Sequence, residues 1–184
     1  MVRMTTPICD FGWHAPAFSL ADPAGRLWTL EQCRGERGTL VMFICNHCPY
    51  VQAVIDRLVA DTRRLRETGV NSVAIMPNDV AAFPQDGPEH MARLAAALDF
   101  PFPYLFDETQ ATARAYGAVC TPDFFGFNSR LELQYRGRLD ESGREPASAT
   151  ARRELLEAMQ AVAATGRGPT EQIASIGCSI KWRE

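Results

Sequence analysis

The sequence predicts an α/β domain with a central mixed β-sheet flanked by helices. Residues 39–44 form a continuous apolar run, which is typical of a strand buried on both faces. Residues 50–67 then place apolar side chains on one face of a helix, and a second apolar run follows at 70–76. Two strands joined by a helical crossover are expected to lie parallel with a right-handed connection. A later hairpin contributes antiparallel strands, which makes the predicted sheet mixed.

The elements on either side of the crossover helix are marked by turn residues. Residues 1–15 are expected to be irregular. The segments 18–20 and 27–30 flank a turn-rich loop, so they predict a β-hairpin before the first buried strand. Gly69 is expected to end the crossover helix.

The second half of the chain continues the alternation of helices and strands. A loop at 77–87 begins with Asn78 and Asp79, which are expected to shape a substrate groove or to form a turn. The tail at 175–182 alternates apolar and polar residues, so it predicts an extended segment packed on the domain. The elements expected between them are a helix at 88–98, a strand at 103–106, a helix at 109–116, strands at 123–128 and 131–136, and a helix at 149–165.

The chain of 184 residues is expected to form a single domain, with a core at about 14–165 and a tail at 166–184 that packs back on it. A net charge of -3 does not favour nucleic acid or a membrane as a partner. The first residues lack the apolar core of a signal peptide, so a cytoplasmic location is expected. Six cysteines are too few for a disulfide scaffold, and in that compartment disulfides are more often catalytic than structural.

The segment Cys45-Asn46-His47-Cys48 carries the clearest chemical signal, because it joins the first buried strand to a helix. A thiol at the start of a helix lies near unpaired backbone N–H groups, which favour the nucleophilic thiolate. We expect Cys45 to attack a disulfide and Cys48 to resolve the mixed disulfide that results. His47 lies between them with no acid in the motif, so its protonated form is expected to lower a cysteine pKa and make the pair more oxidising.

Further motifs extend from about residue 14 to the end of the chain. Together with the Cys-x-x-Cys they resemble the thioredoxin-like superfamily, in the alkyl hydroperoxide reductase/thiol-specific antioxidant branch and its peroxiredoxin-like subgroup with a Cys-x-x-Cys. The resemblance implies a thioredoxin fold with an N-terminal β-hairpin and a C-terminal extended tail. It also implies that Thr121 and Pro122 form a cis-proline loop opposite the dithiol, where Thr121 presents its backbone to substrate. The matching segments are 15–20, 43–50, 101–110, 120–125, 135–138 and 175–182.

The peroxide-activating motif of typical peroxiredoxins, Pro-x-x-x-Thr/Ser-x-x-Cys, is missing in either alignment. With Cys48 in the peroxidatic position, Val41 and Cys45 replace the proline and the hydroxyl residue. With Cys45 in that position, Gly38 and Met42 replace them. The resemblance therefore does not carry peroxide reduction over as an activity, and a fast reaction with peroxide is not expected.

Three more residues are candidates for supporting roles. The strand at 39–44 lacks the buried acid of thioredoxins, and Asp123 is the nearest replacement as a proton relay, with a structural aspartate as an equal alternative. Cys120 lies two residues before the proline, and Cys178 is expected to face the domain from the alternating tail. Cys178 could then return to Cys120, as a second redox pair, or to the dithiol. The alternative is that both are small buried hydrophobic residues.

These observations predict a thiol–disulfide oxidoreductase that cycles a Cys45–Cys48 dithiol. The first alternative is a peroxiredoxin-like hydroperoxide reductase, in which one cysteine becomes a sulfenate and its neighbour resolves it. A lesser alternative is a Cu- or Zn-binding module with Cys45, His47 and Cys48 as ligands, which needs further ligands for a tetrahedral site. The expected partners are a disulfide or peroxide substrate and a thiol electron donor. No organic cofactor is implied, because the dithiol carries the electrons.

Overall fold

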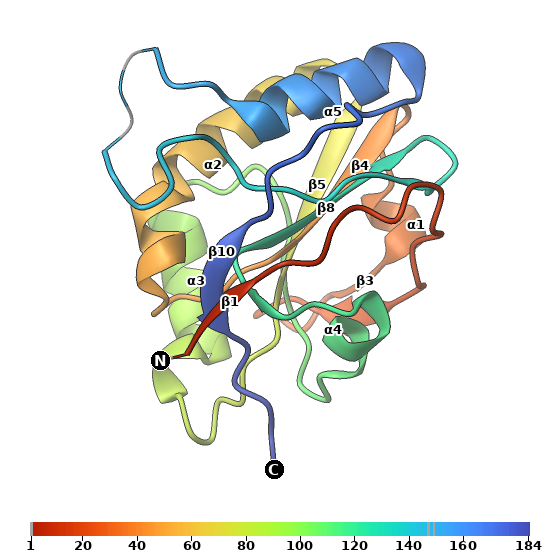
Figure 1. Ribbon diagram of the computed structural model, residues 1–184. Coiled ribbons are helices and arrows are strands. Elements are labelled where there is room, and N and C mark those ends of the chain that lie inside the picture. The colour runs from red at the N-terminus through yellow and green to blue at the C-terminus, as the bar shows by residue number, and fades with distance from the viewer. Residues whose placement is uncertain (1, 147, 149) are drawn as a thin grey trace.

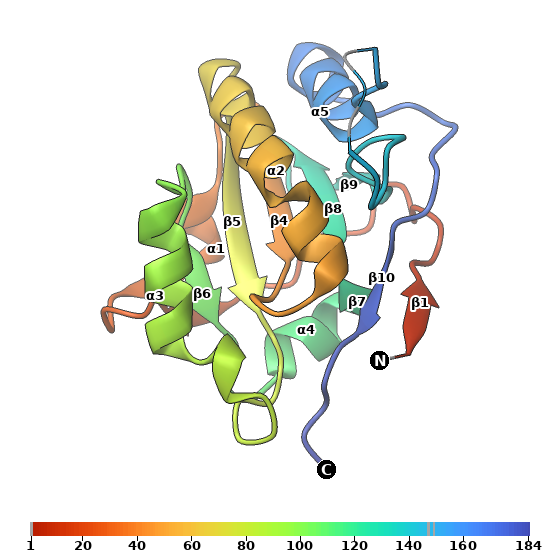
Figure 2. The same cartoon turned by 90° about the vertical axis from the view of Figure 1, so that its left-hand side faces the viewer.

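A computed structural model describes residues 2–146, 148 and 150–184. Within them the chain forms a seven-stranded mixed sheet with the order β3-β2-β6-β5-β4-β8-β9 and a three-stranded sheet with the order β1-β10-β7 (Figures 1 and 2). The large sheet consists of β2 (Ser19–Ala21), β3 (Leu27–Thr29), β4 (Gly38–Phe43), β5 (Val70–Met76), β6 (Tyr104–Phe106), β8 (Asp123–Asn128) and β9 (Leu133–Tyr135). The small sheet consists of β1 (Arg3–Thr5), β7 (Cys120–Thr121) and β10 (Ile176–Ser179).

Helices cover both faces of the large sheet. They are α1 (Leu30–Cys33), α2 (Pro49–Glu67), the 3-10 helix η1 (Pro84–Asp86), α3 (Pro88–Ala97), α4 (Ala111–Tyr116) and α5 (Glu154–Thr165). The sheet separates two hydrophobic clusters, one under α2, α3 and α5 and the other under α1 and α4. Alternate residues of β4 enter the two clusters, with Met42 in the first and Phe43 in the second.

The strand β4 lies inside the large sheet, parallel to β5 and antiparallel to β8. All of its residues are buried, as the continuous apolar run predicts. Because β4 and β5 are parallel, the loops that follow them leave at the same edge of the sheet. That edge receives the Cys-x-x-Cys after β4 and the loop with Asn78 and η1 after β5.

The C-terminal tail packs back on the domain as an extended strand. Figure 2 shows β10 beside the first turns of α2, with β1 on its outer side. β10 pairs with β7 in antiparallel register, which places Cys178 opposite Thr121 and Ser179 opposite Cys120. Both ends of the chain therefore meet at the loop that precedes Pro122.

The mixed sheet and the first hairpin agree with the predictions, but the short elements β1, α1 and β7 were not predicted. β1 forms inside the segment 1–15, which was expected to be irregular, and α1 follows the hairpin directly. The last helix begins at Glu154, and residue 149, the expected start, lies outside the described residues. β1 and β7 are two or three residues long and form because β10 pairs with both, which no local pattern reveals. Among the described residues, no helix is long and apolar enough to cross a membrane.

Candidate active site

The connection from β4 to α2 fixes the two cysteines of the motif. α2 begins at Pro49, and Cys48 is its N-cap residue with an extended backbone. Proline is favoured at the first helical position, because its φ angle suits the helix and its missing N–H would have no partner there. The thiol at the start of the helix is therefore Cys48, whereas Cys45 lies in the preceding loop, and this corrects the expected placement of Cys45.

The Cys48 side chain is fully buried and surrounded by hydrogen-bond donors. A hydrogen bond from the Cys45 thiol lowers the pKa of Cys48 most, and burial opposes this effect. The thiol of Cys178 and the backbone N–H groups of Val51 and Cys178 lower the same pKa further. The Thr121 carbonyl oxygen lies 3.1 Å from the Cys48 sulfur and accepts a hydrogen bond from the neutral thiol, so it works against these donors. The net effect of burial and these hydrogen bonds is a lowered pKa of Cys48, which favours its thiolate.

Cys45 has the opposite protonation preference. Its pKa is raised by donating a hydrogen bond to Cys48, by burial and by the nearby charge of Asp86. A hydrogen bond of 3.3 Å joins its sulfur to the Thr121 hydroxyl oxygen. These shifts favour Cys48 over Cys45 as the thiolate of the pair, whereas the sequence led us to expect Cys45 as the attacking thiol.

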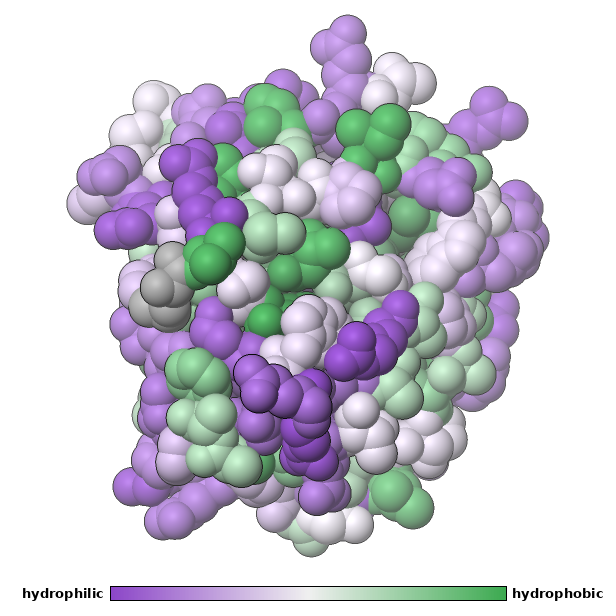
Figure 3. All heavy atoms as spheres, turned by 60° about the horizontal axis from the view of Figure 1, so that its bottom comes forward, coloured by the Kyte–Doolittle hydropathy of each residue, from purple (hydrophilic) through white to green (hydrophobic). Residues whose placement is uncertain are grey.

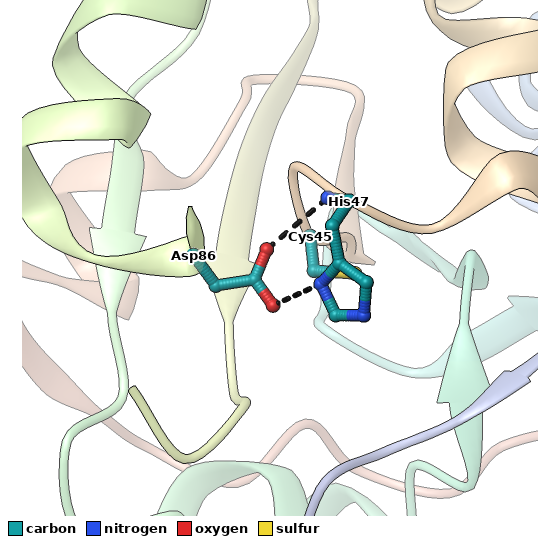
Figure 4. Close-up of side chains that lie close together, drawn as sticks. All are labelled: Cys45, His47 and Asp86. Carbon is teal, nitrogen blue, oxygen red and sulfur yellow. Dashed lines mark hydrogen bonds and ion pairs between the residues drawn. The ribbon is translucent and has the colours of Figure 1, made fainter. Parts of the chain in front are cut away.

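His47 is held by a buried carboxylate that the motif itself does not contain (Figure 4). Its ring nitrogen Nδ1 lies 2.6 Å from Oδ2 of Asp86, a fully buried residue at the end of η1. Asp86 also accepts the backbone N–H groups of Asn46 and His47 at 2.9 and 3.2 Å. The ring of Phe83 stacks on His47 with a centroid distance of 5.3 Å. The motif contains no acid, but the fold supplies one to His47 from η1.

Asn78 connects this carboxylate to the tail. Its amide nitrogen donates to Asp86 at 2.8 Å, and its side-chain oxygen accepts the backbone N–H of Lys181 at 2.9 Å. The loop after β5 thus supplies a buried support for the Cys-x-x-Cys segment. In the sequence, Asp86 is one polar residue of a long loop, and nothing local to it indicates that it reaches His47.

Asp123 has a structural position in this chain. It is fully buried and accepts from Arg136 at 3.0 and 3.4 Å and from the backbone N–H of Val119 at 3.3 Å. Burial raises its pKa, while the charge of Arg136 lowers it. Asp123 is paired with Arg136, and the carboxylate whose charge raises the pKa of Cys45 is Asp86, so these contacts favour the structural alternative over the proton relay.

The peptide bond between Thr121 and Pro122 is cis, as the resemblance implies. Thr121 contacts both cysteines of the motif, but its strand β7 is already paired with β10. The backbone position implied for substrate is therefore taken by the protein's own tail. A cavity of about 260 Å³ opens beside Pro122, between Tyr50 of α2 and Ile176 of β10.

The two cysteines of the suggested second pair lie on different faces of the small sheet. Residues opposite one another in an antiparallel pair share a face and neighbours alternate, so Cys178 lies with Thr121 and Cys120 with Ser179. The Cys120 thiol donates to the Pro122 carbonyl at 3.5 Å, and burial raises its pKa. The structure therefore brings Cys178 to the dithiol and does not favour its pairing with Cys120.

Three side chains of this site could also hold a metal ion. The sulfur of Cys45, a ring nitrogen of His47 and a carboxylate oxygen of Asp86 lie within 4.8 Å of one another (Figure 4). His47 Nε2 is buried and has no hydrogen-bond partner among the described residues. This donor set suits a borderline or soft cation such as Zn²⁺ or Cu(I), with Asp86 as a ligand that the sequence did not suggest.

Comparison with known proteins places the chain in a family. A model of the AhpC/TSA family matches residues 11–140. The chain belongs to the AhpC/TSA family. Membership of this family supports a thiol-based redox function, but it does not specify the reaction. No curated protein matches this AhpC/TSA-family protein.

Solved structures share its fold. An uncharacterized conserved protein from Geobacillus kaustophilus is 41% identical over 100% of this chain and 97% of its own, with a TM-score of 0.93. A hypothetical protein from Sinorhizobium meliloti 1021 is 36% identical over 97% of each chain, with a TM-score of 0.91. The peroxidoxin BcpB from Mycobacterium tuberculosis is 14% identical over 86% of this chain and 98% of its own, with a TM-score of 0.63, and it shows the fold alone. The thioredoxin-like fold predicted from the sequence is confirmed.

Proposed function

We propose that the protein is a thiol–disulfide oxidoreductase that cycles Cys45 and Cys48 between a dithiol and a disulfide. The observation that carries the proposal is the placement of both thiols against Thr121 just before α2, where a hydrogen bond between them lowers the pKa of Cys48 and raises that of Cys45. A thiolate is the nucleophile of disulfide exchange, and a neighbouring thiol resolves the mixed disulfide. The expected substrate is a disulfide, and a separate thiol compound returns the electrons.

In the proposed cycle, the Cys48 thiolate attacks a substrate disulfide R–S–S–R′, forms Cys48–S–S–R and expels R′S⁻. Cys45 then loses its proton, attacks the Cys48 sulfur and expels RS⁻, which leaves the Cys45–Cys48 disulfide. Two electrons pass from the dithiol to the substrate. The released thiolates take up protons, one of which comes from Cys45.

His47 and Asp86 are the proposed acceptors of the Cys45 proton. With the Nδ1 proton of His47 bonded to Asp86, Nε2 carries a free lone pair, and this nitrogen has no partner among the described residues. One ring nitrogen of His47 lies within 4.8 Å of the Cys45 sulfur. A base close to a thiol of raised pKa speeds the second attack, because the thiolate and not the thiol is the nucleophile.

The test is a reaction of the reduced protein with one equivalent of oxidised glutathione, followed by alkylation, trypsin and mass spectrometry. The tryptic peptide 38–57 contains both Cys45 and Cys48, and it is expected to carry an internal disulfide. Cys48→Ser should leave Cys45 reduced, whereas Cys33→Ser should behave as wild type, because Cys33 lies in the cluster under α1. Wild-type protein in which both thiols stay alkylatable would overturn the proposal.

Peroxide reduction is a second candidate because Cys48, which occupies one peroxidatic alignment, caps a helix and has a lowered pKa. In this reaction the Cys48 thiolate would reduce a hydroperoxide, release the alcohol or water and become a sulfenate that Cys45 resolves. The assay is the rate of thiol loss with hydrogen peroxide, compared with that of a small free thiol. A rate several orders of magnitude faster would favour this candidate, and a comparable rate would leave disulfide exchange in first place.

A metal-binding role is the lesser candidate, and it rests on the contact of Cys45, His47 and Asp86. It predicts near-stoichiometric Zn or Cu in protein purified without chelators, and loss of that metal in Asp86→Asn. Protein that binds neither metal after reduction would exclude this role.

A further inference from the structure

The last strand of the chain lies at the redox site. β10 pairs with β7, with Cys178 opposite Thr121, and it also packs against α2. Thr121 contacts the sulfur of Cys48 through its carbonyl and that of Cys45 through its hydroxyl. Three cysteines from two distant segments, the Cys-x-x-Cys and β10, therefore meet at one residue of the cis-proline loop.

Cys178 acts directly on Cys48. Both residues belong to the same buried cluster, and hydrogen bonding from the thiol and the backbone N–H of Cys178 lowers the pKa of Cys48. Burial and this same hydrogen bond raise the pKa of Cys178 to about 11, and the charge of Lys181 opposes them. The Cys178 residue is 5% exposed, so its thiol belongs to the buried cluster. Cys48 thus contacts two thiols, Cys45 in the loop before its helix and Cys178 in the tail.

We propose that Cys178 is a third thiol of the redox centre, which resolves a mixed disulfide at Cys48 as an alternative to Cys45. The inference rests on the proposed disulfide exchange. Cys48–S–S–R and the Cys178 thiol react to give Cys48–S–S–Cys178 and RSH. The bond between Cys48 and the substrate breaks, the new disulfide forms, and the Cys178 proton passes to the departing sulfur. The substrate disulfide supplies the oxidising equivalents, so no further oxidant is needed.

The consequence is a covalent link between the tail and the start of α2. β10 occupies the edge of β7, and a peptide substrate needs that edge if Thr121 is to present its backbone to it. A Cys48–Cys178 disulfide fixes β10 in this position and leaves Cys45 as a free thiol. The surface at this end of the molecule, turned toward the viewer in Figure 3, mixes hydrophobic and hydrophilic groups. A tail linked to Cys48 by this disulfide would therefore close the site to a peptide, whereas a tail with reduced Cys178 leaves the site able to carry out disulfide exchange.

The experiment uses the same full-length protein and the same mass-spectrometric assay. Trypsin separates the three thiols, because Cys45 and Cys48 lie in peptide 38–57 and Cys178 lies in peptide 168–181. After reaction with oxidised glutathione, Cys45→Ser is expected to yield the linked pair 38–57/168–181 as its main product. Wild type should yield this pair together with the internal Cys45–Cys48 disulfide, and Cys178→Ser should yield the internal disulfide alone.

Two controls keep the outcomes separate. Cys120→Ser should match wild type, because Cys120 lies on the other face of β7. Thermal unfolding of each variant shows that it is folded, and serine at position 45 can still bond to the Thr121 hydroxyl. If Cys45→Ser stops as a Cys48–glutathione adduct with Cys178 fully alkylated, the inference is overturned while disulfide exchange stands. If wild type forms neither the internal nor the linked disulfide, the proposed function falls as well.

Discussion

Replacing Asp123 with asparagine should destabilise the fold without stopping thiol exchange. Both carboxylate oxygens of Asp123 accept from Arg136, and the aspartate is fully buried. In Asp123→Asn the guanidinium loses its counter-charge in a site where Arg136 is 9% exposed. It keeps its hydrogen bond of 2.8 Å to the Gly117 carbonyl, which compensates for part of the loss.

The expected magnitude follows from the burial of the pair. Breaking a buried ion pair by removing one partner costs about 3–5 kcal/mol, because the other charge stays in a site of low polarity. The asparagine retains one acceptor oxygen and nearly the same shape, so we expect the lower end, about 3 kcal/mol. For a chain of this size such a loss lowers the melting temperature by roughly 6–12 °C.

The assay is urea unfolding of reduced wild type and Asp123→Asn, together with the rate of disulfide formation at a temperature where both are folded. Asp99→Asn is the matched control, because Asp99 forms an exposed pair with Arg63 and its loss should not change stability measurably. A variant as stable as wild type would refute the reasoning from burial. A folded variant that forms its disulfide much more slowly would refute the structural role and restore Asp123 as a proton relay.

Three further outcomes are expected. The pKa of Cys48 is lowered, so its thiolate absorbance in the ultraviolet should persist as the pH falls below about 8.5, where an ordinary free thiol loses this absorbance. Cys48→Ser should abolish the signal. A signal that survives in the variant would contradict its assignment to Cys48. Asp86→Asn removes a charge that raises the Cys45 pKa, so the second thiol should titrate at a lower pH in the same assay, and an unmoved titration would exclude the charge effect. Gly177→Ala places a methyl group against the Thr121 carbonyl, so β10 should detach. Amide hydrogen exchange of 176–179 should then accelerate and the Cys48–Cys178 linkage should disappear, whereas wild-type protection would show that β10 tolerates the methyl group.

Much of the fold could be predicted because it depends on local periodicity. The apolar run of β4 and the apolar face of α2 can each be recognised in a short stretch of consecutive residues. The crossover between parallel strands has a fixed hand. The short strands β1 and β7 could not be predicted in this way, since each exists by pairing with β10.

The candidate site was predictable to the same extent. The motif after β4 is visible as a short pattern, and the cis bond before Pro122 was implied by the resemblance to the family. The position of Pro49 also indicates that Cys48 caps the helix, although the motif alone suggests Cys45. That signal was in the sequence, and it decides which sulfur lies closest to the unpaired N–H groups.

The sheet, the crossover helix and the placement of two thiols between them can be predicted from the sequence alone, because strand and helix patterns are properties of neighbouring residues. The charges and thiols that surround that pair are known only from the folded arrangement. It brought Asp86 to His47 from another loop, matched Asp123 with Arg136 and placed Cys178 against Cys48. Burial, the hydrogen bond between Cys45 and Cys48, and contacts from distant segments shift the pKa of each sulfur, and these effects exist only once the chain has folded.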